Sequence, residues 1–239
     1  KRQALPDLRR RLRSALLVSL ACALAIPLAY GEWHALAGWG VFLGIWIIAS
    51  GVLNLHQRLR GAPLRSLPLG YWGMLVAHAG MAVCVIGIAL VKTYELERDV
   101  RMQAGDTLVL AGYRFVFQGV DELDGPNYRA VRGRFEVTRG GASLNLLPEK
   151  RIYASSRMPM TEAAIDTGVL RDLYVSLGEP LTNGGWSVRV YYKPFVDWIW
   201  GGFLLMALGG LIAARDRRYR LHTRTAIGSS DLAPAGGQA

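Results

Sequence analysis

Cysteine and histidine are scarce in this chain, and their absence from whole segments excludes several kinds of site. Only two cysteines and four histidines occur among 239 residues. There is no Cys-x-x-Cys-His motif, so the chain does not itself attach haem covalently. Residues 92–194 contain neither cysteine nor histidine, which excludes a Ser-His-Asp triad or a Cys/His metal cluster there. Cys22 and Cys84 fall in apolar stretches, where a free cysteine packs as a small hydrophobe.

Most of the chain has little net charge, despite a formal charge of +10 and a pI of about 10.0 for the whole. Six lysines or arginines lie in residues 1–13, three arginines in the 56–69 connection and five after residue 214. Residues 92–194 hold 14 basic and 13 acidic residues, which nearly balance. The basicity therefore indicates membrane topology rather than a nucleic-acid partner.

Long apolar runs are abundant, and 51% of the residues are hydrophobic. A membrane-spanning helix needs roughly 20 predominantly apolar residues. Four segments qualify or nearly do, the first being short and containing Pro27: residues 14–30, 35–55, 70–91 and 195–214.

The positive-inside rule then sets the orientation of these spans. It places a basic segment (1–13), the 56–69 connection and a basic tail (215–239) in the cytoplasm. Residues 92–194 would lie in the bacterial periplasm, and the protein in the lipid of the inner membrane. The end of the tail, residues 227–239, is rich in small residues, and we expect it to be disordered.

Residues 92–194 have the pattern of an antiparallel β domain inserted before the last span. Tyr113, Phe115 and Phe117 recur at every second position, as in a half-buried strand. Turn signals occur at 124–126, 140–141 and 183–184. We expect six to eight short strands in one small sandwich or barrel, with residues 161–166 as a short helix or irregular arm. The predicted fold class is a polytopic α-helical membrane protein with an extracytoplasmic antiparallel β domain.

The third apolar run contains one histidine, His78. An imidazole in hydrocarbon is costly unless it is bound to something. It lies eight residues from Gly70, or ~12 Å into the membrane from the cytoplasmic end. Helical spacing puts small residues in one stripe (Gly73, Ala77, Gly80, Cys84 and Gly87) and His78 in an adjacent row with Met74, Met81 and Val85.

Such a stripe lets a neighbouring backbone or a flat ligand approach closely. Two interpretations remain open from the helix alone. His78 either forms a hydrogen bond across a tight helix pair or binds a cofactor.

The other histidines carry weaker signals. His34 could ligate a haem at the outer surface, but Trp33 and Trp39 beside it are typical of the aromatic belt at a membrane interface. We interpret His56 as a solvated interface residue and His222 as an exposed residue of the arginine-rich tail.

Several motifs form a collinear series that covers at least residues 70–220: 73–83, 85–90, 97–102, 125–129, 149–151, 160–166, 171–174 and 191–200. This series resembles the C-terminal part of the CcmF family of the cytochrome c maturation system. Residues 1–69 fit by topology more than by motif.

The resemblance implies a haem-handling role. In this family a b-type haem is held within the membrane, and His78 matches one of its two axial ligands. Met74 and Met81 would pack against the porphyrin, and Ala77 is a further cofactor-contact candidate. The resemblance also implies four partners: a periplasmic haem chaperone, thioredoxin-like subunits that present apocytochrome c, the apocytochrome itself, and the N-terminal part of the same protein.

The family's Trp-rich haem-handling segment and its second axial ligand have no counterpart here. The chain is therefore expected to be a piece of a longer or split protein that is not competent for haem ligation alone. An alternative is a non-catalytic scaffold whose β domain recruits partners and whose His78 only ties helices together. A haem or small-molecule transporter would need polar residues along several spans, and these spans contain few.

Overall fold

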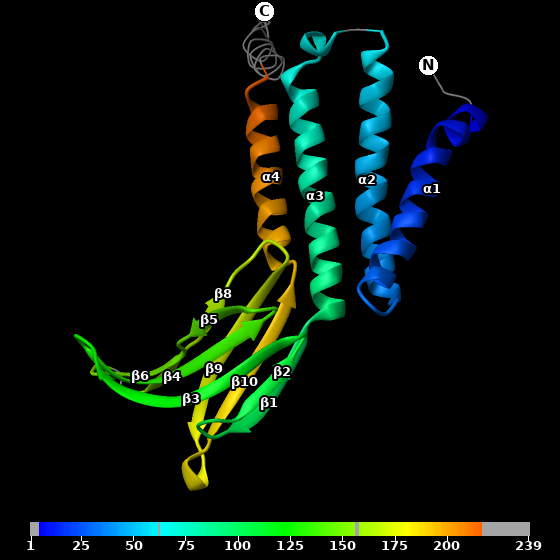
Figure 1. Ribbon diagram of the computed structural model, residues 1–239. Coiled ribbons are helices and arrows are strands. Elements are labelled where there is room, and N and C mark those ends of the chain that lie inside the picture. The colour runs from blue at the N-terminus through cyan, green and yellow to red at the C-terminus, as the bar shows by residue number, and fades with distance from the viewer. Residues whose placement is uncertain (1–4, 62, 156–157, 217–239) are drawn as a thin grey trace, which may run out of the picture. The chain divides into compact units, whose positions relative to one another are not determined.

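Length and apolar composition determine the helical part of the fold. The computed structural model describes residues 5–61, 63–155 and 158–216. Within them, four helices are long and apolar enough to cross a membrane. They are α1 (Leu5–Ala29), α2 (Ala35–Leu59), α3 (Leu69–Tyr94) and α4 (Val196–Ala214), with a 3-10 turn (Leu64–Ser66) before α3 (Figure 1). The predicted polytopic helical fold class is confirmed.

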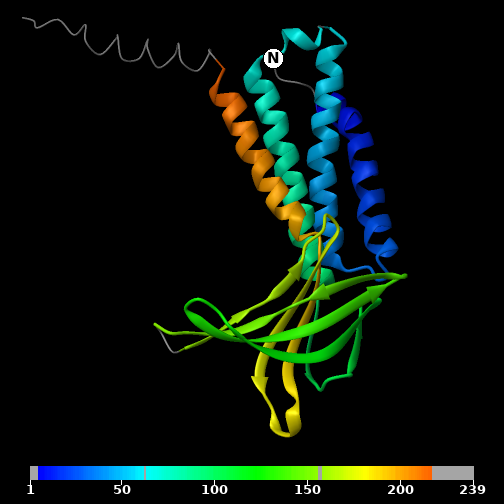
Figure 2. The ribbon, with the colours of Figure 1, turned by 60° about the vertical axis from the view of Figure 1, so that its left-hand side comes forward.

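The helix termini follow local chain chemistry. Gly31 has a φ of +120°, which suits a residue without Cβ, in the tight link between α1 and α2. In this link the Trp33 indole donates a hydrogen bond of 3.2 Å to the carbonyl of Ala23. The link therefore packs back onto α1 and holds the two helices antiparallel. Figures 1 and 2 both show α2 between α1 and α3, and α3 between α2 and α4.

The chain forms two compact units, which divide at Ile86 and Ile199. The helical unit contains α1, α2 and most of α3 and α4. The second unit, Gly87–Trp198, is almost entirely β. Residues 217–239, which include most of the predicted basic tail, its predicted disordered end and His222, lie outside the described residues.

Two antiparallel sheets make up the β unit. The first has the strand order β1-β10-β9-β8, and the second β2-β3-β4-β6-β7, with β5 also paired to β4. The strands are β1 (Leu96–Met102), β2 (Thr107–Leu110), β3 (Tyr113–Asp124), β4 (Tyr128–Arg139), β5 (Ala142–Leu146), β6 (Glu149–Tyr153), β7 (Pro159–Glu162), β8 (Ala164–Asp166), β9 (Arg171–Pro180) and β10 (Trp186–Pro194).

The core lies between the two sheets and consists of their inward-facing apolar side chains. Phe115, Phe117 and Phe135 of the second sheet are at most 1% exposed, and the rings of Phe117 and Phe135 stack at 4.8 Å. Leu173 and Val190 face them from the first sheet and are fully buried. Each such side chain contributes about 1.5–3 kcal/mol on burial. The predicted alternation at 113–117 is therefore the core face of β3.

Two expectations for this domain were wrong. The described residues contain ten strands rather than six to eight. Residues 161–166, expected as a short helix or irregular arm, lie in β7 and β8. These two strands belong to different sheets and are separated by Ala163, so the chain crosses from one sheet to the other there. Pairing with β6 and β9 makes these residues extended despite their lack of apolar alternation.

Asp172 on β9 makes the stability of the domain depend on pH. The residue is 8% exposed and accepts a hydrogen bond of 3.1 Å from the Gly168 amide. Burial raises the pKa of its carboxyl above the usual value, because the amide bond does not offset the lost hydration. A raised folded-state pKa gives a stabilisation that is complete below the unfolded-state pKa and is lost as pH rises through the folded-state pKa.

Asp172→Asn is therefore expected to gain stability relative to the wild type as pH rises from acidic to neutral, because asparagine can still accept the Gly168 bond but carries no charge. Thermal unfolding followed by the β-sheet circular dichroism signal at several pH values measures this difference. A difference that shrinks with rising pH would contradict the assignment.

Candidate functional site

α3 presents two faces, and α4 occupies the first. Gly73 and Gly80 are buried. A Cβ atom at Gly73 would lie 2.5 Å from the carbonyl oxygen of Gly209, and one at Gly80 would lie 2.6 Å from that of Gly202. These distances leave no space for a side chain, so the two backbones touch, as in other helix pairs with small residues at the interface. The small-residue stripe is therefore the surface of α3 that packs against α4.

Asp216, just after α4, joins the two helices at one end. The Gly70 amide, in the first turn of α3, donates a hydrogen bond of 2.8 Å to Oδ2 of Asp216. Amides in a first turn have no acceptor within their own helix, and a carboxylate is favoured near the positive end of the helix dipole. Asp216, which is 8% exposed, therefore caps α3 from the neighbouring helix.

The second face of α3 carries His78 and is open within the described part of the chain. Met74 is 42% exposed, Met81 is 48% exposed, and His78 is exposed between them. Ala77 lies on the other side, where a Cβ at Gly209 would be 2.5 Å from its backbone nitrogen. Three of the four predicted cofactor contacts thus share one open row, and Ala77 belongs to the contact with α4.

A hydrogen bond fixes the orientation of the His78 ring. Its Nδ1 lies 2.8 Å from the carbonyl oxygen of Met74, one turn earlier. A carbonyl can only accept, so Nδ1 carries the hydrogen and the neutral ring keeps its lone pair on Nε2. His78 forms no bond across the helix pair in the described structure. It has the arrangement of a metal-ligating histidine, with one nitrogen bonded to a carbonyl and the other available.

An apolar groove of about 270 Å³ runs between α2 and α3 beside His78. The two helices touch at both ends of it: a Cβ at Gly44 would lie 2.5 Å from the Ile86 side chain, and the Tyr71 hydroxyl donates a 2.8 Å bond to Asn54. The groove is smaller than the roughly 300–1,000 Å³ of sites that enclose a whole ligand. It therefore has room for one edge of a flat molecule.

Sequence reasoning missed this groove, whose lining includes Gly51 on α2 and Trp72 and Leu75 on α3. Gly51, in the middle of an apolar span, is the feature that could have indicated it. A glycine there leaves a gap, because even a Cβ added at Gly51 would lie 3.6 Å from the nearest atom of another helix, a methyl carbon of Leu75.

The two other histidines among the described residues, His34 and His56, lie at helix ends. His34 directly precedes α2, and its Nε2 is 3.6 Å from the Glu32 carboxylate. His56 is exposed in the last turn of α2. Among the described residues, no group of three or more His, Cys, Asp or Glu side chains is placed to hold a metal ion. His78 is therefore the strongest candidate ligand in the described chain.

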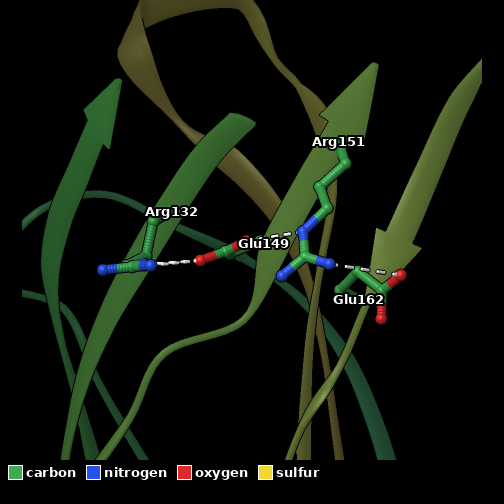
Figure 3. A network of polar contacts seen from close by, with 4 residues as sticks. All are labelled: Arg132, Glu149, Arg151 and Glu162. Carbon is green, nitrogen blue, oxygen red and sulfur yellow. Dashed lines mark hydrogen bonds and ion pairs between the residues drawn. The ribbon is translucent and has the colours of Figure 1, made fainter. Parts of the chain in front are cut away.

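In the β unit, the most organised polar group is a network around Glu149. Figure 3 shows this carboxylate between the guanidinium groups of Arg132 and Arg151, with Glu162 on the far side of Arg151. Arg132 Nε and Arg151 Nε each donate a 2.7 Å bond to Glu149, which is 5% exposed. Burial raises the pKa of Glu149, but the bonds from Arg151 and Arg132 outweigh it, so the net pKa is lowered. All bonding groups of this buried carboxylate are satisfied, which is typical of a structural network.

Comparison with known proteins gives consistent matches to one family. The family model described as "CcmF C-terminal beta-sandwich" matches residues 93–194. The Cytochrome c-type biogenesis protein CcmF of Pseudomonas aeruginosa is 47% identical over 90% of this chain and 34% of its own length. The protein of the same name from Escherichia coli is 43% identical, again over 90% of this chain and 34% of its own.

A solved structure titled "Cytochrome c Heme Lyase CcmF" has the same fold. It aligns with a TM-score of 0.73 and 24% identity, covering 89% of this chain and 35% of that one. The chain thus spans about a third of the length of the curated relatives it matches. The match of its β sandwich to the family model and its identity to these relatives over 90% of its length show that this chain belongs to the CcmF family, to whose C-terminal part it corresponds.

Proposed function

We propose that this chain is the part of a cytochrome c haem lyase that holds a membrane-embedded b-type haem. In the whole protein, the cysteines of a Cys-x-x-Cys-His motif in apocytochrome c would add across the two haem vinyl groups to form thioethers. The observation that carries the proposal is the exposed His78 ring, whose Nδ1 is hydrogen-bonded to the Met74 carbonyl so that Nε2 is left for a ligand.

The residues on this face fit an axial haem site. The Met74 carbonyl keeps Nδ1 protonated and so orients Nε2 for coordination. Met74 and Met81, one turn to either side, offer flexible apolar surface for a porphyrin. The groove beside Leu75 and Trp72 would take one edge of it. Ala77 lies on the opposite face of α3, in the contact with α4, so it would support the position of the helix rather than touch the haem.

The second axial ligand would come from the part of the protein outside this chain. A bound haem b supplies one-electron transfer, which would keep the iron of the haem being attached reduced. The role of this chain's residues would be to bind and orient the resident group and to surround it with apolar side chains.

Topology and partners complete the proposal. Basic flanks on the N-terminus, the 56–69 connection and the C-terminal tail favour a cytoplasmic location for all three in a bacterial inner membrane. The β domain, residues 92–194, would then be periplasmic. It would dock the haem chaperone, the thioredoxin-like subunits, apocytochrome c or the N-terminal part of the protein.

A scaffold without a resident haem is the second candidate function. The absence of histidine and cysteine from residues 92–194 favours a docking role for the β domain. Under this alternative, His78 would only support helix packing, and its replacement would not change the reduced-minus-oxidised haem spectrum.

Reduced-minus-oxidised spectra of the purified intact complex distinguish these functions. His78→Ala is expected to abolish the b-type signal, whereas His56→Ala, an exposed histidine on the neighbouring helix, retains it. His78→Gly should regain part of the signal when imidazole is added, because the free ring can occupy the vacated space. An unchanged signal in His78→Ala would contradict ligation and support the scaffold.

A further inference from the structure

One end of the β sandwich is joined directly to a candidate membrane span. Arg171, the first residue of β9, pairs with Pro194, the last residue of β10, and α4 begins two residues later at Val196. The Phe195 amide donates a 3.1 Å hydrogen bond to the carbonyl of Leu170. α4 is a candidate membrane span that begins at Val196, so in a bilayer the β8–β9 loop would lie close to the membrane surface.

Apolar side chains at this loop are left uncovered. Val169 is 70% exposed and Leu170 is 59% exposed. Single exposed apolar residues are common, but two in succession beside the start of a span are typical of a loop that enters the headgroup region. Trp198, in the first turn of α4, adds the kind of aromatic ring that is enriched at this depth.

Two arginines meet over one tyrosine beside this loop. The Arg171 guanidinium lies 5.2 Å from the ring centre of Tyr113, and Arg171 Nε donates a 2.9 Å bond to the Tyr113 hydroxyl. Arg139 lies 4.6 Å from the same ring centre. Burial raises the pKa of Tyr113, but bonds from Arg139 and Arg171 outweigh it and lower the net value, as expected where positive potential is strong.

The charges of this cluster are only partly balanced. Arg171 forms an ion pair with Asp166. No carboxylate among the described residues pairs with Arg139, whose side chain is exposed. The cluster therefore has one positive charge available to a negatively charged oxygen group from outside.

We propose that this end of the β sandwich binds the phosphate of an anionic lipid, held by Arg139 and Arg171 beside Tyr113, with Val169 and Leu170 among the headgroups. A lipid phosphate is the anion expected at this depth, and the apolar loop next to the arginines matches an amphipathic ligand better than a free ion. The site is independent of the haem proposed at His78.

Lipid retention by the intact protein tests the arginine contact. The protein is reconstituted in nanodiscs of phosphatidylcholine with a minor share of phosphatidylglycerol, and bound phosphatidylglycerol is counted by native mass spectrometry. Arg139→Gln is expected to weaken its retention about fivefold, the effect of one basic residue near a membrane surface. The control is Arg129→Gln, an arginine with a 90% exposed side chain at the opposite end of β4, which should behave as the wild type.

A spin label tests the depth of the loop. Attached at Val169→Cys, with Cys22 and Cys84 replaced by alanine, it should be more accessible to oxygen than to a water-soluble nickel reagent. A label at Asn127→Cys, in the β3–β4 turn, should show the reverse.

Four results would overturn the proposal: equal phosphatidylglycerol retention by wild type and Arg139→Gln, displacement of the lipid by millimolar inorganic phosphate, a loss of haem rather than lipid in Arg139→Gln, and a water-exposed label at Val169. The second indicates a site for a free ion, and the third a site for a haem propionate.

Discussion

Replacing Gly209 with valine is expected to force α4 away from α3 and to destabilise the helical unit by about 1–3 kcal/mol, the usual cost of overpacking. A Cβ at this position would lie 2.5 Å from the Ala77 nitrogen and 2.6 Å from the Gly73 carbonyl oxygen. Both are backbone atoms within helices and cannot move aside as a side-chain terminus can. The expected cost is therefore at the upper end of this range.

The neighbouring glycine is a matched control. A Cβ added at Gly210 would have no atom of another segment within 4 Å, so Gly210→Val should leave stability close to that of the wild type. Unfolding of the intact protein by titration of a denaturing detergent into mixed micelles measures both variants. Equal losses in the two variants would show that valine itself, rather than the contact with α3, is responsible.

Glu149→Ala is expected to destabilise the β domain by about 2–3 kcal/mol. Removal of one partner of a buried ion pair typically costs 3–5 kcal/mol, because the remaining charge is left unpaired in a poorly hydrated place. The side chains of Arg132 and Arg151 are 37% and 27% exposed, so water can reach them and the cost is reduced.

An exposed pair of an arginine and a carboxylate is the control. Asp124 and Arg129 form an ion pair in which the side chains are 87% and 90% exposed. Asp124→Ala should change stability by less than about 1 kcal/mol, since exposed pairs contribute little. Thermal unfolding of the intact protein at neutral pH compares the variants. If both losses are small and similar, Glu149 is not a structural centre of the sheet.

The helical part of the fold was predictable because apolar length alone identifies a span. The runs at 35–55, 70–91 and 195–214 each correspond to one helix. The β domain was harder. Tyr113, Phe115 and Phe117 alternate and were assigned to a strand, but β6 and β7 consist largely of charged and polar residues. They are strands because they pair with β4 and with each other, and such pairing has no local pattern.

The candidate site was partly predictable for the same physical reason. Depth within an apolar run singled out His78, and helical spacing separated the glycine stripe from the methionine row. Spacing cannot identify what lies against each face. The partners of Gly73 and Gly80 are Gly209 and Gly202, more than 120 residues away, and Gly51 lies on another helix. Only the folded helical unit shows that α4 packs against the glycine stripe and that Met74, His78 and Met81 remain exposed.

The cap on Gly70 also sets an order of assembly. Its acceptor, Asp216, is 146 residues later in the chain, beyond the β domain and α4. At 5–20 residues per second, roughly 7–30 seconds of synthesis separate the two. During that interval the glycine face and the first-turn amide of α3 are exposed to lipid or to other helices. The N-terminal cap of α3 can therefore form only after α4 has been made.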